Sequence, residues 1–174
     1  LDEPFAALDH KRRRAFLASL RDMHRRLSLP MIVVTHQIDD VAFLADQVVG
    51  LENGVVAACG ALDRVAFDPA FQALLDARDL GAPVPAQAIA ARPGEAGRVW
   101  MRADNVILAA AEPSGLSARN VWPGVIDSVV VEGERSCLVC VRAEAATLLS
   151  RVTPEAVAEL DLAQNTCARL ADGK

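Results

Sequence analysis

Two neighbouring carboxylates, Asp2 and Glu3, stand in the segment LDEPFAALD, and a further acid, Asp9, ends it. Carboxylate oxygens grouped in this way suit a divalent cation and a water molecule that the cation and a general base activate. The segment allows a second interpretation, in which Asp9 is the N-cap of a helix that starts with the basic run HKRRR. The segment by itself favours neither interpretation.

The composition indicates a globular protein with a hydrophobic core. The chain has 174 residues, of which 52% are hydrophobic, and this suits one medium domain or two small ones. The net charge is −5 and the basic residues are scattered outside Lys11–Arg14, so no surface for nucleic acid is expected. We interpret the basic run as a solvated helix face. No apolar stretch approaches the roughly 20 residues of a membrane span.

The four cysteines, Cys59, Cys137, Cys140 and Cys167, are too scattered for a disulfide framework and indicate cytosolic thiols. Cys137 and Cys140 form a C-x-x-C within SCLVCVRA, a run with strand character. Residues three apart on a strand point to opposite faces, which argues against a shared zinc ion.

Residues 1–80 show the pattern of an α/β domain. Apolar residues at helical spacing predict an amphipathic helix from Asp9 to Leu27. Its expected buried stripe is Phe16, Leu20, Met23 and Leu27. The β-branched run in LPMIVVTHQ predicts a strand buried on both faces, as in a parallel sheet.

Residues 39–45 then predict a short helix, and QVVGLENGVVAACG predicts a hairpin that turns at Glu52-Asn53-Gly54. Residues 60–80 indicate helical pieces that Pro69 breaks. The Pro, Gly and Ala content of residues 81–98 predicts a linker. In residues 99–174 short strands alternate with turn residues, which is typical of a small β-barrel or sandwich.

Two segments resemble parts of ABC-transporter ATPases. LDEPFAALD is similar to the end of their Walker B motif and their D-loop, and VVTHQIDDVAFLADQVVGLENGVVAACG is similar to their switch-histidine segment and the hairpin after it. The resemblance implies that Asp2 helps to hold Mg²⁺ and Glu3 polarises the attacking water. It also implies that Asp9 lies in the D-loop at the dimer interface and that His36 contacts the γ-phosphate of ATP.

The phosphate loop, the glutamine loop and the ABC signature of that family are missing from the 174 residues. Backbone N–H groups and a lysine of the phosphate loop cradle nucleotide phosphates. We therefore expect the chain to be the C-terminal part of a longer subunit and to be inactive as an ATPase by itself.

The segment LSARNVWPGVI, at residues 116–126, resembles the opening of molybdate-binding Mop domains. Ser117, Arg119 and Asn120 offer hydroxyl, guanidinium and amide donors of the kind a tetrahedral dianion needs. The resemblance adds Thr153 to this oxyanion site, although Ala156 replaces a serine of the family. The alternative is a polar loop that merely precedes a strand.

Together these resemblances predict a partial RecA-like α/β ATPase domain followed by a small, mostly β, OB-fold-like Mop domain. They imply the ATP-binding subunit of a molybdate or tungstate ABC importer, with ATP, Mg²⁺ and the oxyanion as ligands. The expected partners are a second copy of the subunit, membrane permease subunits and, indirectly, a periplasmic binding protein. The expected location is peripheral, on the cytoplasmic side of the inner membrane.

Two alternatives stay open. An importer of sulfate, polyamines or sugars would have a related β domain, but Ser117-Ala118-Arg119-Asn120 argues against it. A non-enzymatic cytoplasmic molybdate-binding protein is the other, and a phosphate loop encoded upstream would exclude it.

Overall fold

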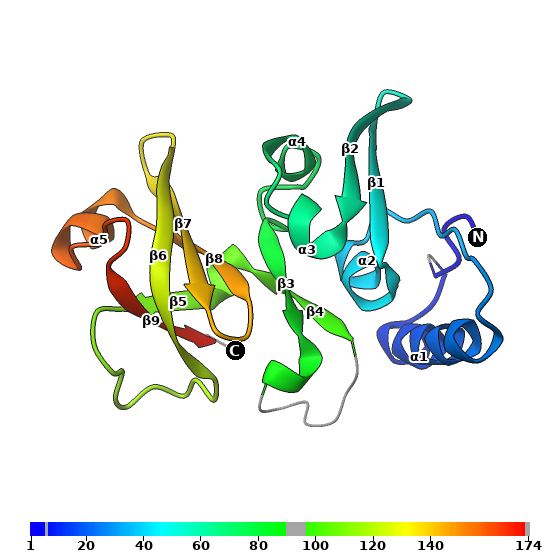
Figure 1. Cartoon of the computed structure of the whole chain (residues 1–174), viewed down its shortest axis with the longest axis horizontal. Helices are drawn as coiled ribbons and strands as arrows, with labels where there is room; N and C mark the ends of the chain where they lie inside the picture. The colour runs from blue at the N-terminus through cyan, green and yellow to red at the C-terminus, as the bar shows by residue number, and fades with distance from the viewer. Residues whose placement is uncertain (6, 90–96, 173–174) are drawn as a thin grey trace.

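A computed structural model describes residues 1–5, 7–89 and 97–172, and in it strands predominate (Figure 1). The first part contains α1 (His10–Leu27), α2 (Ile38–Leu44), β1 (Gln47–Glu52), β2 (Val55–Ala61), α3 (Leu62–Val65) and α4 (Pro69–Gln72). The second contains β3 (Gly81–Pro85), η1 (Ala86–Ala88), β4 (Arg98–Arg102), η2 (Ala103–Asn105), β5 (Val106–Ala109), β6 (Val121–Glu132), β7 (Ser136–Ala143), β8 (Thr147–Val152), α5 (Pro154–Glu159) and β9 (Cys167–Asp172). No described helix combines the length and the apolarity that crossing a membrane requires.

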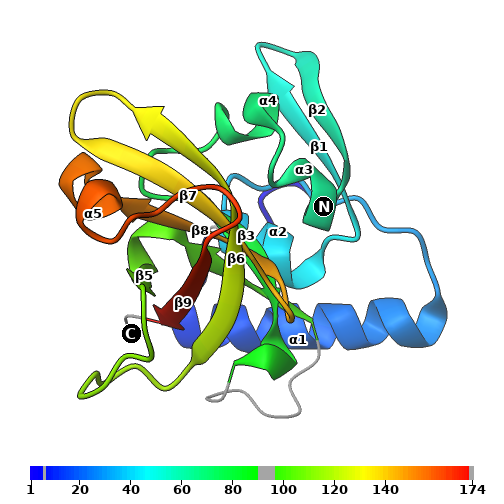
Figure 2. The same cartoon turned by 60° about the vertical axis from the view of Figure 1, so that its left-hand side comes forward.

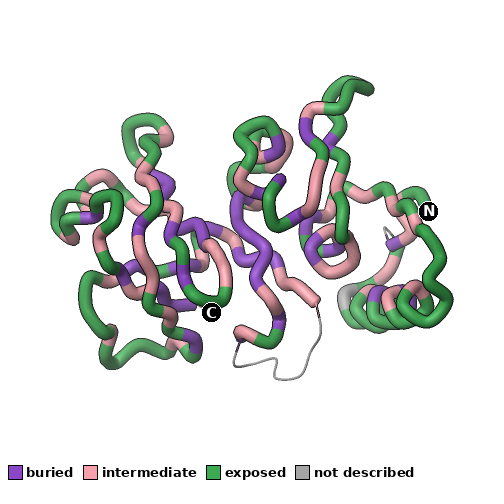
Figure 3. Tube along the Cα trace, viewed as in Figure 1, coloured by how far each residue is buried: buried purple, intermediate pink, exposed green. Residues whose placement is uncertain are grey.

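Helix α1 is confirmed, but only part of its predicted stripe is buried. Leu20 packs with Leu17 and Phe5, whereas Phe16, Met23 and Leu27 are about half exposed. The described residues cover α1 along one side only, so a single row of its apolar side chains finds a neighbour. The exposed colour along α1 in Figure 3 shows the same asymmetry.

The run LPMIVVTHQ was predicted to be a strand buried on both faces, and this is wrong for the described structure. It has a single parallel bridge, between Asp2 and Val34, and Ile32 is 82% exposed. A strand of a parallel sheet is buried only when strands flank it and helices cover both faces. Among the described residues, only the segment around Asp2 pairs with it.

The hairpin and the helical pieces are confirmed. Strands β1 and β2 pair antiparallel around Asn53 (φ 49°) and Gly54 (φ 79°), two left-handed residues typical of a tight hairpin turn. Pro69 lies in the first turn of α4, where its missing N–H costs nothing, and Asp68 caps that helix.

The first residues of the predicted linker 81–98 form a strand. β3 pairs antiparallel with β4, and Gly81–Val84 are buried. Pro83 and Pro85 fit because β3 has one partner strand, so their lack of an N–H interrupts no second ladder. Residues 90–96 of that linker lie outside the described residues.

The second part is built round a five-stranded sheet in the order β5-β9-β6-β7-β8, which curves around one interior in Figure 2. The two edge strands come together where the buried Ser150 Oγ of β8 donates to the Val106 carbonyl of β5, at 2.6 Å. The interior holds a cluster of buried apolar side chains that includes Ile126, Val139, Leu148 and Leu170. This arrangement is OB-like, a small barrel closed round its own core.

The Ser150 hydrogen bond yields a test of this closure. Ser150→Ala leaves the buried Val106 carbonyl without its partner, and we expect it to lower the free energy of unfolding by about 1–3 kcal/mol. Urea unfolding measures the change. The control is Ser19→Ala, which removes an equivalent hydroxyl bond to the Ala15 carbonyl on the exposed face of α1. Equal small effects of the two substitutions would contradict closure through Ser150.

Candidate functional site

Two short segments run parallel and bring Glu3 and His36 to the same edge. The Leu1 amino group donates to the Ile32 carbonyl (2.9 Å), Val34 N donates to the Leu1 carbonyl (2.8 Å), and Glu3 N donates to the Val34 carbonyl (2.9 Å). Ligand sites of parallel sheets lie beyond the carboxyl ends of the strands. Glu3 and His36 occupy those ends.

The Glu3 carboxylate contacts His36 directly. Its Oε1 lies 2.7 Å from His36 Nδ1 and accepts the backbone N–H of His36 at 3.2 Å. Glu3 has a positive φ of 41°, an unfavourable conformation for a residue with a side chain and one that occurs at functional sites. The His36 side chain is 70% exposed and that of Glu3 37%, so both are open to a ligand. A carboxylate and an imidazole placed in this way can polarise water and contact a phosphate oxygen.

The other two acids of the opening segment are placed differently. Asp2 is exposed beside Glu3, and its carboxylate is the kind of oxygen ligand that Mg²⁺ takes together with water and phosphate. Asp9 caps α1 by accepting the Arg12 N–H at 2.9 Å, so the capping interpretation is confirmed. Among the described residues no group of three or more metal-ligating side chains occurs.

A buried ion pair that the sequence did not reveal supports this edge. Asp40 of α2 is buried and accepts from Arg13 Nε at 3.0 Å and Arg13 Nη2 at 2.6 Å. The hydrogen bond to Asp40 raises the pKa of Arg13. The interpretation of the basic run as wholly solvated is therefore wrong for Arg13, which joins α1 to α2. One feature of the sequence could have indicated this buried pair. Asp39 and Asp40 are neighbours on α2, and on a packed helix one of two adjacent acids faces inward.

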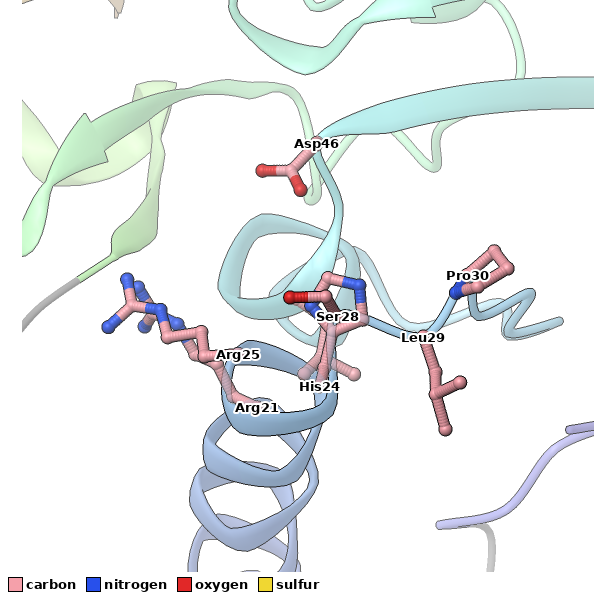
Figure 4. Close-up of a pocket in the computed structure, with 8 residues that line it drawn as sticks. Arg21, His24, Arg25, Ser28, Leu29, Pro30 and Asp46 are labelled. Atoms are coloured by element: carbon pink, nitrogen blue, oxygen red, sulfur yellow. The ribbon is translucent and has the colours of Figure 1, made fainter.

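A separate depression of about 460 Å³ lies at the C-terminal end of α1 (Figure 4). Arg21, His24 and Arg25 line it, with Asp46 on the opposite side. Arg21 also lies over the Phe43 ring, 4.9 Å from its centre. None of the predicted site residues lines this depression.

The Ser-Ala-Arg-Asn segment lies in the loop between β5 and β6, where its members divide into two groups. Ser117 and Arg119 are exposed. Asn120 is buried and donates through Nδ2 to Asp172 Oδ2 at 3.1 Å, while Asp172 N donates to the Asn120 carbonyl. The Asn120 side chain thus links β9 to the start of β6. The sequence predicted instead that Asn120 donates to the oxyanion.

Thr153 is also engaged in a local bond. Its Oγ1 accepts the Ala156 N–H at 3.2 Å and caps α5. The Thr153 hydroxyl therefore already has a local partner within the chain.

The C-x-x-C cysteines lie on β7, with Cys137 buried and Cys140 partly buried. Burial raises the pKa of Cys140 to about 11. Its thiol therefore stays protonated at neutral pH and is a poor nucleophile and metal ligand.

Comparison with known proteins identifies the β part. Residues 116–171 match the family model of the TOBE domain. This span runs from the Ser-Ala-Arg-Asn loop to the end of the barrel.

Nearly the whole chain also matches longer proteins. It is 34% identical over 193 residues to the molybdenum import ATP-binding protein ModC of Granulibacter bethesdensis, covering 93% of this chain and 52% of that protein. ModC 1 of Azotobacter vinelandii is 33% identical over 186 residues, which cover 94% of this chain and 52% of that protein. Over nearly its whole length the chain is therefore similar to molybdenum import ATP-binding proteins. It spans about half the length of these curated relatives.

A solved structure also matches in sequence. The molybdate-bound form of the cytoplasmic molybdate-binding protein ModG is 31% identical, with a TM-score of 0.39 over 44% of this chain and 57% of that chain.

The Asn120 contact predicts that this residue acts on stability. Asn120→Ala leaves the buried Asp172 carboxylate without this donor, and we expect a loss of about 1–3 kcal/mol in the free energy of unfolding. The matched control, Ser117→Ala in the same exposed loop, should change it by less than about 0.5 kcal/mol. Chemical unfolding of both variants checks this, and an Asn120→Ala variant as stable as the control would contradict it.

Proposed function

We propose that the chain is part of the ATP-hydrolysing subunit of an ABC importer for molybdate or tungstate. In this proposal residues 1–80 belong to a RecA-like ATPase domain and residues 99–174 belong to a domain that binds the oxyanion. The observation that carries it is the contact of Glu3 with His36, in one chain with a TOBE domain. The printed description of the relatives supports the same function.

The proposed ATPase chemistry uses the edge at Glu3 and His36. Glu3 Oε1 accepts a hydrogen bond from the attacking water and polarises it, while His36 donates to a γ-phosphate oxygen and lies against Glu3 in the free site. Asp2 would hold Mg²⁺, which supplies positive charge for the phosphate oxygens. Asp9 caps α1 and so fixes where the D-loop ends.

The proposed oxyanion site uses Arg119 and Ser117, which are exposed on one loop. A tetrahedral dianion has four oxygens, and one guanidinium, one hydroxyl and nearby backbone N–H groups leave some of them without donors. Because Asn120 and Thr153 are engaged within the chain, a second copy is the natural source of further donors. We therefore place the oxyanion between two subunits.

The same proposal includes a homodimer bound to membrane permease subunits on the cytoplasmic side of the membrane, with a periplasmic binding protein as an indirect partner. Oxyanion held between two TOBE domains would couple its cytoplasmic concentration to the geometry of the ATPase dimer. A sulfate importer and a non-enzymatic oxyanion store are the alternatives that the experiments below separate.

The ATPase role predicts that Glu3→Gln, in the full-length subunit, abolishes turnover and spares nucleotide binding. The substitution keeps the side-chain shape and removes the base that polarises water. Steady-state phosphate release and nucleotide titration measure the two effects. Glu52→Gln, at the exposed end of β1, is the control and should retain turnover. The isolated 174-residue chain should show no turnover, and normal turnover in Glu3→Gln would mean that Glu3 is misassigned.

The oxyanion role predicts a loss of affinity in Arg119→Ala. Losing a charged hydrogen-bond partner costs about 1.5–3 kcal/mol, so molybdate should bind roughly ten- to a hundredfold more weakly. Calorimetry with molybdate, tungstate and sulfate gives the affinities, and light scattering gives the number of chains per complex. Arg142→Ala is the control because Arg142 is an exposed arginine on β7, outside the loop that carries Arg119. Equal sulfate affinity would favour a sulfate importer, and unchanged molybdate affinity in Arg119→Ala would remove this loop from the site.

A further inference from the structure

Strand β4 presents its alternate side chains to two different parts of the molecule. Val99 and Met101 pack into the core of the barrel. Trp100 instead packs into a second core together with Ile38 and Ala42 of α2. Period-two alternation places Arg98 and Arg102 on the same face of β4 as Trp100.

These three residues hold α2 along its length. At its first turn, Arg102 Nη2 and Nη1 donate to Asp39 Oδ2 and Oδ1, at 2.9 and 3.3 Å. At its other end, Arg98 donates to the carbonyl of the C-cap residue Ala45. Trp100 packs between these ends. We call Arg98, Trp100 and Arg102 the β4 clamp.

Helix α2 depends on such contacts for its position. It has only seven residues, and its N-cap residue, Gln37, makes no capping hydrogen bond through its side chain. Isolated helices of this length are unstable in water, so packing determines where α2 lies. His36 immediately precedes Gln37, and a displacement of the first turn of α2 therefore moves His36.

Arg102 also separates two negative charges. Its guanidinium lies 2.9 Å from Asp79 Oδ1 as well as from Asp39 Oδ2. Removing the cation leaves these carboxylates facing one another, which repels the first turn of α2 from the segment that carries Asp79. Hydrogen bonding to Asp39 raises the pKa of Arg102, so its guanidinium is charged at neutral pH.

We propose that the β4 clamp sets the position of His36 relative to Glu3, with Arg102 as the positioning residue. The proposal rests on the proposed ATPase function for its consequence. Since Val99 and Met101 of β4 pack against the core of the barrel, a shift of the oxyanion-binding part reaches His36 through this strand. Arg13, bonded to Asp40, holds the same helix from the side of α1.

Hydrogen–deuterium exchange of the 174-residue chain tests the clamp without requiring activity. Arg102→Gln and Asp39→Asn should each speed exchange in residues 36–44 by roughly tenfold, the effect expected for loss of a charged hydrogen bond. The double variant should speed exchange by less than the two single changes combined, because both remove the Arg102–Asp39 contact. Arg142→Gln, which removes an exposed ion pair with Asp127, should leave these residues unchanged. Unchanged exchange in both single variants, or equal acceleration throughout the chain, would overturn the proposal.

Kinetics of the full-length subunit test the consequence at His36. Arg102→Gln should lower kcat several-fold and leave KM for ATP unchanged, and Arg102→Lys, which keeps the charge, should restore part of kcat. A raised KM with normal kcat, or no rescue by lysine, would overturn the positioning role. An inactive wild-type subunit would refute the proposed ATPase function instead. The exchange experiment alone would then test whether the β4 clamp holds α2 in place.

Discussion

Strand β4 belongs to two cores, and the rest of the structure depends on this constraint. Val99 and Met101 pack against the core of the barrel while Trp100 fills the space beside α2, so the two parts share this strand. Figure 3 shows buried segments meeting between the two parts, around β3 and β8. Besides Arg98 and Arg102 of β4, Arg151 of β8 also joins the two parts. It donates to the Ala77 carbonyl at 2.9 Å and to Asp104 at 2.6 Å. Buried contacts and ion pairs therefore join the barrel to the part of the chain that carries α2.

Local signals in the sequence predicted most of the elements. The Asp9 cap, the Asn53-Gly54 turn and the barrel strands each depend on a few neighbouring residues, and all are present. The buried stripe of α1, the two-sided burial of the strand after Pro30 and the linker at 81–98 depend on which distant segments pack there. A periodic pattern gives the face of an element but not its neighbour, so these predictions failed in part.

The candidate site divides in the same way. Glu3 and His36 were predicted from motifs, and the structure brings them within 2.7 Å. Asn120 and Thr153 are suitable donors by residue type, but each already bonds within the chain, and composition does not show this. The Arg13–Asp40 pair and the Arg102–Asp39 pair were missed because they join residues far apart in sequence. Charged side chains usually face water, so nothing local distinguishes these arginines.

We propose that one chain joins a nucleotide-binding edge to an oxyanion-binding domain, and the position of the bound oxyanion tests this proposal most directly. Crystals of the chain grown with tungstate, measured across the tungsten absorption edge, locate the anion without any assumption about the site. The account predicts an anomalous peak beside Arg119, between two copies of the chain. A peak within a single copy away from Arg119, or no peak when tungstate saturates the protein in solution, would contradict it.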